Sequence, residues 1–283
     1  MPATDELAYS AIDRTEAAER ERLIRLLDTQ NEWEDIQSGK RIVLDQLDIQ
    51  PGWTVLDAGS GTGYDLLQLG ELVGPAGRAV GIDASKQLLD IARQRLDGTG
   101  LPVELLHADI RDLPFEDDTF DAVRSERVIQ HVDDIPAAID ELIRVTKPGG
   151  RIVIFDTDVS TFSVSIGLPD ELEARLHEFW RGGPDVRNIR HVPFLMEQRG
   201  LASTSVTPQL GFHDGASWSS FLELQGDQHP ALLAAREQGI IDSREYEQYV
   251  AAQDRAIANG TFLTWAVMLV VAGSKPSEPP SSN

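Results

Sequence analysis

The chain has 283 residues, of which 47 are acidic and 25 basic, so its formal net charge is −22. This charge repels phosphate backbones and anionic membrane surfaces, which disfavours nucleic acids and lipid headgroups as partners. The sequence has no cysteine, which excludes disulfides, thiolate nucleophiles and zinc sites built on cysteine. Without a leader pattern or an apolar run long enough to span a bilayer, the chain is expected to be soluble and cytoplasmic.

The first 50 residues predict a helical cap. Residues 5–30 are rich in Glu, Arg, Ala and Leu, and Leu23, Ile24 and Leu27 recur at helical spacing. A further helix is expected from about 36 to 47, because an apolar pattern there is followed by the Pro51-Gly52 stop signal.

Between residues 53 and 157 short β-branched runs alternate with helical patterns, which is typical of a doubly wound parallel sheet. The expected strands are WTVLDA, AVGID, VELLHAD, FDAVRSE and RIVIFDTD. The expected helices are YDLLQLGELV, SKQLLDIARQRL and IPAAIDELIRV, the second capped by Ser85. Residues 51–160 are therefore expected to form an α/β core.

After residue 158 the alternation breaks down. Helices are expected at 169–181 and 192–200, a strand at 201–212, a long helical insertion at 217–258 and a last strand at 261–271. Residues 161–273 are thus expected to complete the sheet, with the insertion serving either as a lid or as a contact in a homodimer. The Pro/Ser-rich tail, 274–283, is expected to be disordered.

The most informative motif is VLDAGSGTGYD at 55–65, an apolar strand followed by glycines that open a helix. Glycines allow positive φ and close approach of the backbone to a ligand, and the helix start favours an anionic group; a tight turn without a ligand is the alternative. The spacing is GxGxG and not the GxGxxG of pyrophosphate binders. Asp83 ends the next strand, where a carboxylate can accept from the ribose hydroxyls of an adenosine, in NAD or another nucleoside, or can instead cap the helix after Ser85.

The sequence resembles the class I S-adenosylmethionine (SAM)-dependent methyltransferases of the small-molecule, ubiquinone/menaquinone type. The resemblance rests on four blocks in order, which are VLDAGSGTG, VGIDAS, HADIRDLPFEDDTFD with SERVIQHVDD, and LIRVTKPGGRIVIFD. It implies a Rossmann-like, seven-stranded, mostly parallel sheet of order 3-2-1-4-5-7-6, with N-terminal helices and a helical insertion before the last strand.

The resemblance also implies the residues that bind SAM. They are Asp57, Gly59, Ser60, Gly61, Thr62, Gly63, Asp83, Ala84, Asp109, Ile110, Ser125 and Glu126. In this scheme Asp57 and the glycine turn hold the methionine moiety, and Asp83 takes the ribose hydroxyls. Asp109 accepts from the adenine amine, with Ala84 and Ile110 beside the ring. Ser125 and Glu126 line the cavity into which the sulfonium points.

Methyl transfer is an in-line displacement, so the protein mainly aligns donor and acceptor; a base is required when the accepting atom carries a proton. The first candidate is His131, which follows the fourth strand, with a purely structural histidine as the alternative. His213, in a loop expected to overhang the pocket, is the second. His107 and Glu126 are weaker candidates.

Arg127 and Gln130 are candidates for holding a polar acceptor, although Arg127 could instead pair with Asp133 or Asp134. Tyr9 and Trp33, before the sheet, are candidates for roofing an apolar pocket, with packing of extra helices as the alternative. Further aromatic candidates after the sheet are Trp180, Phe194, Trp218 and Phe221. No metal site is expected.

The resulting hypothesis is a SAM-dependent methyltransferase that acts at O, N or C of a small organic acceptor, such as a secondary metabolite or a quinone-like compound. Two alternatives stay open. One is a protein of the same fold that keeps SAM for a cyclisation or rearrangement without methylation. The other is a nicotinamide-dependent oxidoreductase, against which the glycine spacing and Asp109 argue.

Overall fold

A computed structural model describes residues 12–14, 16–180, 189–225 and 230–277. Tyr9 and the last part of the tail predicted to be disordered, 278–283, lie outside the described residues. No described helix combines the length and the apolar character that crossing a bilayer requires.

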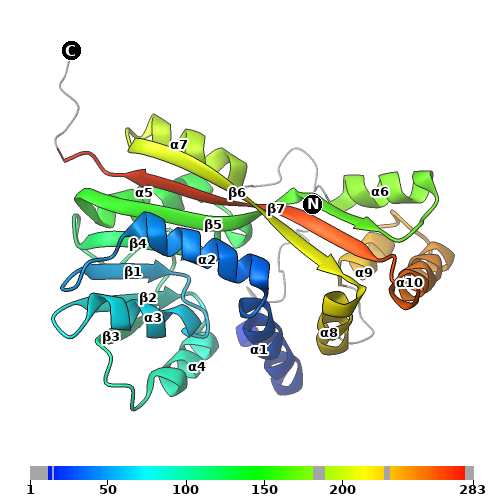
Figure 1. Ribbon diagram of the computed structural model, residues 1–283, viewed down its shortest axis with the longest axis horizontal. Helices are drawn as coiled ribbons and strands as arrows, with labels where there is room; N and C mark the ends of the chain where they lie inside the picture. Colours follow the sequence, from blue (N-terminus) through cyan, green and yellow to red (C-terminus); the bar gives the residue numbers. More distant parts are fainter. Residues whose placement is uncertain (1–11, 15, 181–188, 226–229, 278–283) are drawn as a thin grey trace.

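A seven-stranded sheet of order β3-β2-β1-β4-β5-β7-β6 forms the centre of the molecule, as predicted (Figure 1). The first five strands are parallel, and β7 runs antiparallel between β5 and β6. The strands are β1 (Thr54–Ala58), β2 (Arg78–Asp83), β3 (Val103–His107), β4 (Phe120–Glu126), β5 (Thr146–Ser165), β6 (Ala202–Asp214) and β7 (Leu263–Ser274). The carboxyl ends of the parallel strands meet at one edge, where ligands bind in sheets of this kind.

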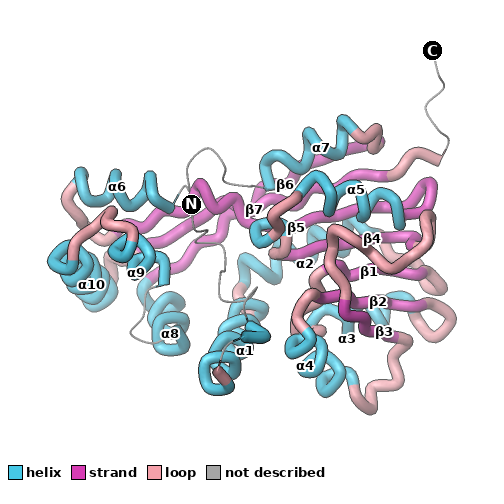
Figure 2. Tube along the Cα trace, turned by 180° about the vertical axis from the view of Figure 1, so that it is seen from behind, coloured by secondary structure: helices cyan, strands magenta, loops and turns pink. Residues whose placement is uncertain are grey.

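Helices cover both faces of the sheet because its central strands are apolar on both sides. One face packs against α2 (Glu34–Leu47), α3 (Tyr64–Val73) and α4 (Lys86–Leu96). The other face, turned to the viewer in Figure 2, packs against α5 (Ile135–Val145) and α7 (Val192–Gln198). The predicted cap is confirmed, because the Ser85 side chain accepts the Leu88 backbone N–H at the start of α4.

The last three strands extend beyond the parallel part and form an arm (Figure 1). The sequence predicts that β5 stops at 158, but it continues to Ser165 because its pairing with β7 resumes at Ser163 after an irregularity. We call the far ends of β5, β6 and β7, together with the four helices on them, the arm lobe. These helices are α6 (Asp170–Trp180), α8 (Gly215–Gln225), α9 (Pro230–Glu237) and α10 (Ser243–Ala258). The lobe has its own buried apolar cluster.

The N-terminal segment connects the two halves. The turn η1 (Ile12–Arg14) contacts α4, and α1 (Ala17–Asn31) packs against both α2 and α8. Figures 1 and 2 both show α1 and α8 side by side below the arm. The edge of the sheet is therefore enclosed by the core on one side and by the arm lobe on the other.

Candidate functional site

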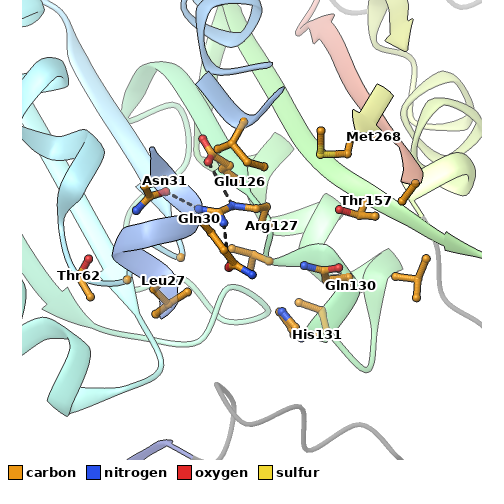
Figure 3. A pocket seen from close by; sticks show the side chains of 18 of the residues that line it. Leu27, Gln30, Asn31, Thr62, Glu126, Arg127, Gln130, His131, Thr157 and Met268 are labelled. Atoms are coloured by element: carbon orange, nitrogen blue, oxygen red, sulfur yellow. Dashed lines mark hydrogen bonds and ion pairs between the residues drawn. The ribbon is translucent and has the colours of Figure 1, made fainter. Parts of the chain in front are cut away.

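A cavity of about 1090 Å³ begins at the carboxyl ends of the parallel strands and continues into the arm lobe. Its lining includes Asp83 and the glycine turn at one end and Trp218 and Tyr249 of the arm lobe at the other. Figure 3 shows the region between them, with Thr62 on one side of Arg127 and Thr157 and Met268 on the other. A pocket for one drug-sized ligand measures roughly 300–1,000 Å³, so this cavity is slightly larger than the upper end of that range.

The glycine turn has the geometry that its sequence requires. Gly59 and Gly61 adopt φ of +89° and +52°, and the N–H of Gly59 donates to the Ile82 carbonyl at 2.8 Å. A Cβ on Gly59 would lie 2.2 Å from Cγ2 of Val128, whereas one on Gly61 would meet nothing within 4 Å. The turn therefore passes close to its neighbour at Gly59 and is open to the cavity at Gly61.

Asp83 joins the turn to the next strand. Its Oδ2 accepts the Gly61 N–H at 2.8 Å, and its Oδ1 accepts the Ser85 N–H at the same distance. Burial raises the pKa of this carboxyl group, although the two backbone donors oppose the rise. Each carboxylate oxygen has two acceptor positions, so Asp83, which lines the cavity, keeps acceptor capacity for a ligand while it also stabilises the turn before α4.

Asp109 and Ile110 form the adjacent wall with Ala84. The Asp109 carboxylate accepts from Arg111 at 3.0 Å (Nε) and 2.6 Å (Nη2), and these hydrogen bonds lower its pKa. Both side chains are about two-fifths exposed (43% and 41%). Any ligand that uses Asp109 must therefore share this carboxylate with Arg111.

A group of six buried or half-buried charges lies behind the glycine turn; we call it the buried ion cluster. Its members are Lys40, Asp57, Asp65, Arg124, Glu126 and Arg127. Lys40 Nζ lies 2.7 Å from Asp65 Oδ1 and 3.4 Å from Glu126 Oε1. Arg124 contacts Asp57 through Nε at 3.3 Å and Asp65 through Nη2 at 3.1 Å.

In this cluster the pKa values of two carboxyl groups, those of Asp57 and Asp65, are shifted in opposite directions. Burial raises the pKa of Asp57 to about 6, against the opposing charge of Arg124. Burial also acts to raise the pKa of Asp65, but the charges of Arg124 and Lys40 exceed it and hold the value at about 2. Asp57, which lines the cavity, is therefore the carboxyl group of this pair that takes up a proton more readily.

Arg127 lies at the centre of the view in Figure 3. It adopts φ of +53°, hydrogen-bonds Asn31 Oδ1 and Gln30 Oε1 of α1, and approaches Glu126 Oε1 at 3.4 Å through Nε. The partners that the structure shows for Arg127 are thus α1 and Glu126, and not the suggested Asp133 or Asp134. Arg127 directly follows β4, so its guanidinium connects the end of this strand to α1.

The two histidines predicted to act as bases differ in environment. His131 ends the short turn η2 (Ile129–His131) and lines the cavity. Burial, with the nearby charge of Arg127, lowers the pKa of His131 to about 4. Its imidazole is therefore neutral at pH 7 and accepts a proton poorly.

His213 lies inside β6 and not in the predicted loop, because β6 continues to Asp214 and pairs His213 with Thr264 of β7. Its Nε2 lies 3.4 Å from Asp35 Oδ2, and its ring centroid lies 4.0 Å from that of Trp33. The ring of Trp218 follows at 6.0 Å. The cavity is lined by all four of these residues, namely Trp33, Asp35, His213 and Trp218.

Two predicted cofactor residues, Gly63 and Ser125, are not among the described residues that line the cavity. Residues alternate along β4, so Ser125 lies buried on the side opposite Arg124 and Glu126. A Cβ on Gly63 would lie 2.8 Å from Cβ of Ala92, which gives this glycine a role in packing α3 against α4.

Some of the other predicted positions also line the cavity, and others do not. Ser60 and Thr62 of the turn and Gln130 beyond β4 line the cavity, and Trp180 of α6 lines its arm end. Phe194 is 58% exposed on α7, outside the cavity, so it does not roof a pocket. The side chain of Phe221 is not among the described ones.

Sequence reasoning missed Lys40, Asp65 and Arg124, although two of them left a signal. Lys40 occupies a position on the buried face of α2, and Arg124 interrupts the apolar pattern of β4. It also missed several residues that line the cavity from the arm lobe, among them Phe162, Tyr249 and Gln253. Nothing in their local sequence signals this role, because it depends on how far β5 and β7 extend.

Comparison with known proteins agrees with this geometry. Residues 56–154 match a family described as a methyltransferase domain. An uncharacterized 37.1 kDa protein of transposon Tn4556 from Streptomyces fradiae is 34% identical over 245 residues, which cover 85% of this chain and 68% of that protein. A demethylmenaquinone methyltransferase from Bacillus cereus is 38% identical over 116 residues, or 41% of this chain. The match spans 49%, about half, of that enzyme's length.

Solved structures show the same fold. The YcgJ protein from Bacillus subtilis superposes with a TM-score of 0.59 at 19% identity, covering 86% of this chain and all of that one. A geranyl diphosphate C-methyltransferase from Streptomyces coelicolor, solved with Mg²⁺, geranyl diphosphate and S-adenosylhomocysteine, gives 0.52 at 17% identity, covering 87% and 82%.

Residues 56–154 thus form a methyltransferase domain, and the chain shares the fold of solved methyltransferases. Two observations at the site fit SAM, namely the turn at Gly61, where the space that a Cβ would take is open and borders the cavity, and the cavity-lining carboxylate of Asp83. Among the described residues, no group of three or more His, Asp or Glu side chains is placed to hold a metal ion.

Proposed function

We propose that the chain transfers the methyl group of SAM to a hydroxyl or an acidic carbon of a small organic acceptor, with His213 as the general base. One observation carries this proposal. The cavity that the glycine turn and Asp83 line is also lined by His213, which Asp35 backs, so donor, acceptor and base would share a single cavity.

The core end of the cavity is assigned to SAM. Asp57 and the turn from Gly59 to Thr62 would hold the methionine moiety, with Asp83 on the ribose hydroxyls. Ala84, Asp109 and Ile110 would flank the adenine. The support for this assignment is that these residues form one continuous wall and that Asp83 retains free acceptor positions.

When bound, SAM supplies an electrophilic methyl group. The chain's own contribution is to align the acceptor with that group and to exclude water, which is the main source of rate in such a displacement. The packing of α1 against α8 and the anchoring of α1 by Arg127 hold the two sides of the cavity together. These contacts support a closed, preorganised site.

His213 removes the acceptor proton in this scheme. Asp35 lies at ion-pair distance from Nε2, which orients the ring and stabilises the imidazolium that forms. His131 is the less suitable base because its pKa of about 4 leaves it a weak proton acceptor at pH 7. We assign His131 instead to lining the cavity next to the reacting groups.

The test is the formation of S-adenosylhomocysteine. The purified chain is incubated with SAM and a panel of phenols, enols and amines, and both products are followed by liquid chromatography and mass spectrometry. We expect one S-adenosylhomocysteine per methylated phenol or enol, and none without acceptor. Conversion of an acceptor with SAM unchanged would support the cyclisation alternative. Failure to bind SAM at about millimolar concentration, the upper end of ordinary KM values, would refute the proposal.

A further inference from the structure

The arm end of the cavity is walled by aromatic and apolar side chains. We call this part the acceptor chamber and define it by Phe162, Trp180, Trp218, Leu232, Tyr249 and Gln253. Trp180 meets Phe162 edge-on at 5.6 Å and Tyr249 edge-on at 6.1 Å, and Trp218 stacks on Phe262 at 5.8 Å behind it. Three different helices and one strand thus fix the rings, which offers flat surfaces to a planar ligand.

Charge is distributed unevenly along the cavity. Among the described lining residues with sequence numbers of 157 and above, none is Asp, Glu, Lys or Arg. The core end of the cavity, by contrast, holds the buried ion cluster, Asp83, Asp109 and Arg111. Burial raises the pKa of Tyr249, so its phenol is also neutral at pH 7. Among the described residues, an anionic acceptor in the chamber would therefore find no cationic side chain to pair with, which is costly for a buried charge.

Gln253 is the exception in this apolar wall. It is only 2% exposed, yet its amide is not among the sealed, unpaired polar groups of the described residues. The small surface that the side chain keeps therefore faces the cavity, where a ligand can hydrogen-bond to it.

The position of the chamber relative to the base supports the same view. His213 lies between Trp33 and Trp218, with ring centroids 4.0 Å and 6.0 Å away. A planar acceptor in the chamber would therefore present one end to His213 while another part reaches Gln253 on α10.

We propose, resting on the function proposed above, that the acceptor is an uncharged, planar apolar molecule with a carbonyl or hydroxyl group that hydrogen-bonds to Gln253, remote from the atom that is methylated. Gln253 is then a residue that determines specificity. It takes no part in proton transfer, so its replacement changes acceptor binding and leaves SAM binding intact.

The experiment uses three matched probes and the full chain saturated with S-adenosylhomocysteine. The probes are 7-hydroxyflavone, 7-phenyl-2-naphthol, which keeps the flat fused rings but lacks the carbonyl, and the 7-phosphate ester of hydroxyflavone; affinities are measured by calorimetry. For the native chain we expect the flavone to bind about tenfold more tightly than the naphthol, as one buried hydrogen bond predicts, and the phosphate ester to bind more weakly than either.

Gln253→Leu should weaken flavone binding about tenfold and abolish its advantage over the naphthol. Gln253→Asn retains an amide and serves if the leucine variant fails to fold. Gln248→Leu, at an exposed position of the same helix, is the matched control and should change nothing. S-adenosylhomocysteine affinity should be equal in all four proteins.

Three results would overturn the inference: tight binding of the phosphate ester, a flavone preference that survives in Gln253→Leu, or no binding of any probe to the saturated protein. Failure of S-adenosylhomocysteine itself to bind the native chain would instead refute the proposed function. The first titration therefore separates the two failures before any acceptor is added.

Discussion

Nε2 of His213 lies 3.4 Å from Oδ2 of Asp35, and both side chains are only 12% exposed. The contact joins β6 of the arm to the first turn of α2, which belongs to the core. It therefore couples the orientation of the ring to the way in which the arm lobe sits on the core. A carboxylate in this position also stabilises the positive charge that the imidazole gains when it accepts a proton.

Replacing His213 by asparagine should abolish most of the activity. The expected loss in kcat is about 10²–10⁴-fold, the usual contribution of a general base. His131→Asn is the matched comparison and should lose less than about tenfold, because a histidine with a pKa of about 4 is a poor base at pH 7. Initial rates of S-adenosylhomocysteine formation with a phenolic acceptor measure both.

The pH dependence of the variants gives an independent check on this assignment. The residual rate of His213→Asn should rise with pH, since hydroxide then ionises the acceptor in place of the side chain. If His131→Asn shows the larger loss and the stronger rise with pH, the roles of the two histidines are reversed.

Asp35→Asn should lower kcat about tenfold with little change in KM for the acceptor, because Asp35 acts through His213 and does not touch the reacting atoms. Asp35→Glu, which keeps the charge, should restore part of the loss. An equal effect of Asp35→Asn in the His213→Asn background would show that the aspartate does not act through the histidine; a double-mutant cycle on kcat makes this comparison.

Asp83→Ala should weaken SAM and S-adenosylhomocysteine alike, by about 10–100-fold, since hydrogen bonds to a charged group contribute about 1.5–3 kcal/mol. The loss includes the bonds from Gly61 and Ser85 that shape the turn. Asp90→Ala, on the exposed side of α4, is the control. Calorimetric titration measures both, and an unchanged affinity in Asp83→Ala would remove this carboxylate from the cofactor site.

The core of the fold and the glycine turn could be predicted because each depends on local pattern. Apolar strands, the Ser85 cap and the spacing of Gly59, Gly61 and Gly63 are properties of short segments, and the structure shows the predicted sheet order. Asp83 follows from its place at the end of a strand. These features need no knowledge of distant residues.

The arm could not be predicted because it depends on pairing across a long stretch of chain. Residues 159–165 are mostly polar and become strand only because β7, about a hundred residues later, pairs with them. The same pairing places His213 inside β6 and brings α10 with Gln253 to the cavity. The local sequence around these residues does not contain that information.

The buried ion cluster makes a prediction about stability. Lys40→Met should lower the free energy of unfolding by about 3 kcal/mol, because Asp65 and Glu126 lose a buried counter-charge. Lys40→Met combined with Asp65→Leu should cost less than the sum of the single changes, since it restores the charge balance. Urea unfolding measures these values. Arg41→Met, at an exposed ion pair on the same helix, should change stability by less than about 1 kcal/mol, and a similar effect at both positions would contradict this account.

Asp156 gives a prediction about pH. It is 1% exposed at the end of the parallel part of β5, and burial raises its pKa from 3.8 to about 7, although the backbone N–H groups of Thr157 and Gln130 oppose the rise. Between these two values the folded chain holds a proton that the unfolded chain releases. Stability from this group is therefore complete below about pH 4 and is lost as the pH rises through about 7.

The comparison with Asp156→Asn isolates this effect, because the side chain at position 156 then does not titrate. Any hydrogen bond that the substitution removes changes the free energy of unfolding by the same amount at every pH. The free energy of unfolding of the native chain, minus that of the variant, should fall by up to about 4 kcal/mol between about pH 4 and pH 8, at about 1.4 kcal/mol per pKa unit. Urea unfolding at several pH values measures the difference. A difference that stays constant, or that increases with pH, would mean that Asp156 is ionised in the folded protein and that the two backbone donors outweigh its burial.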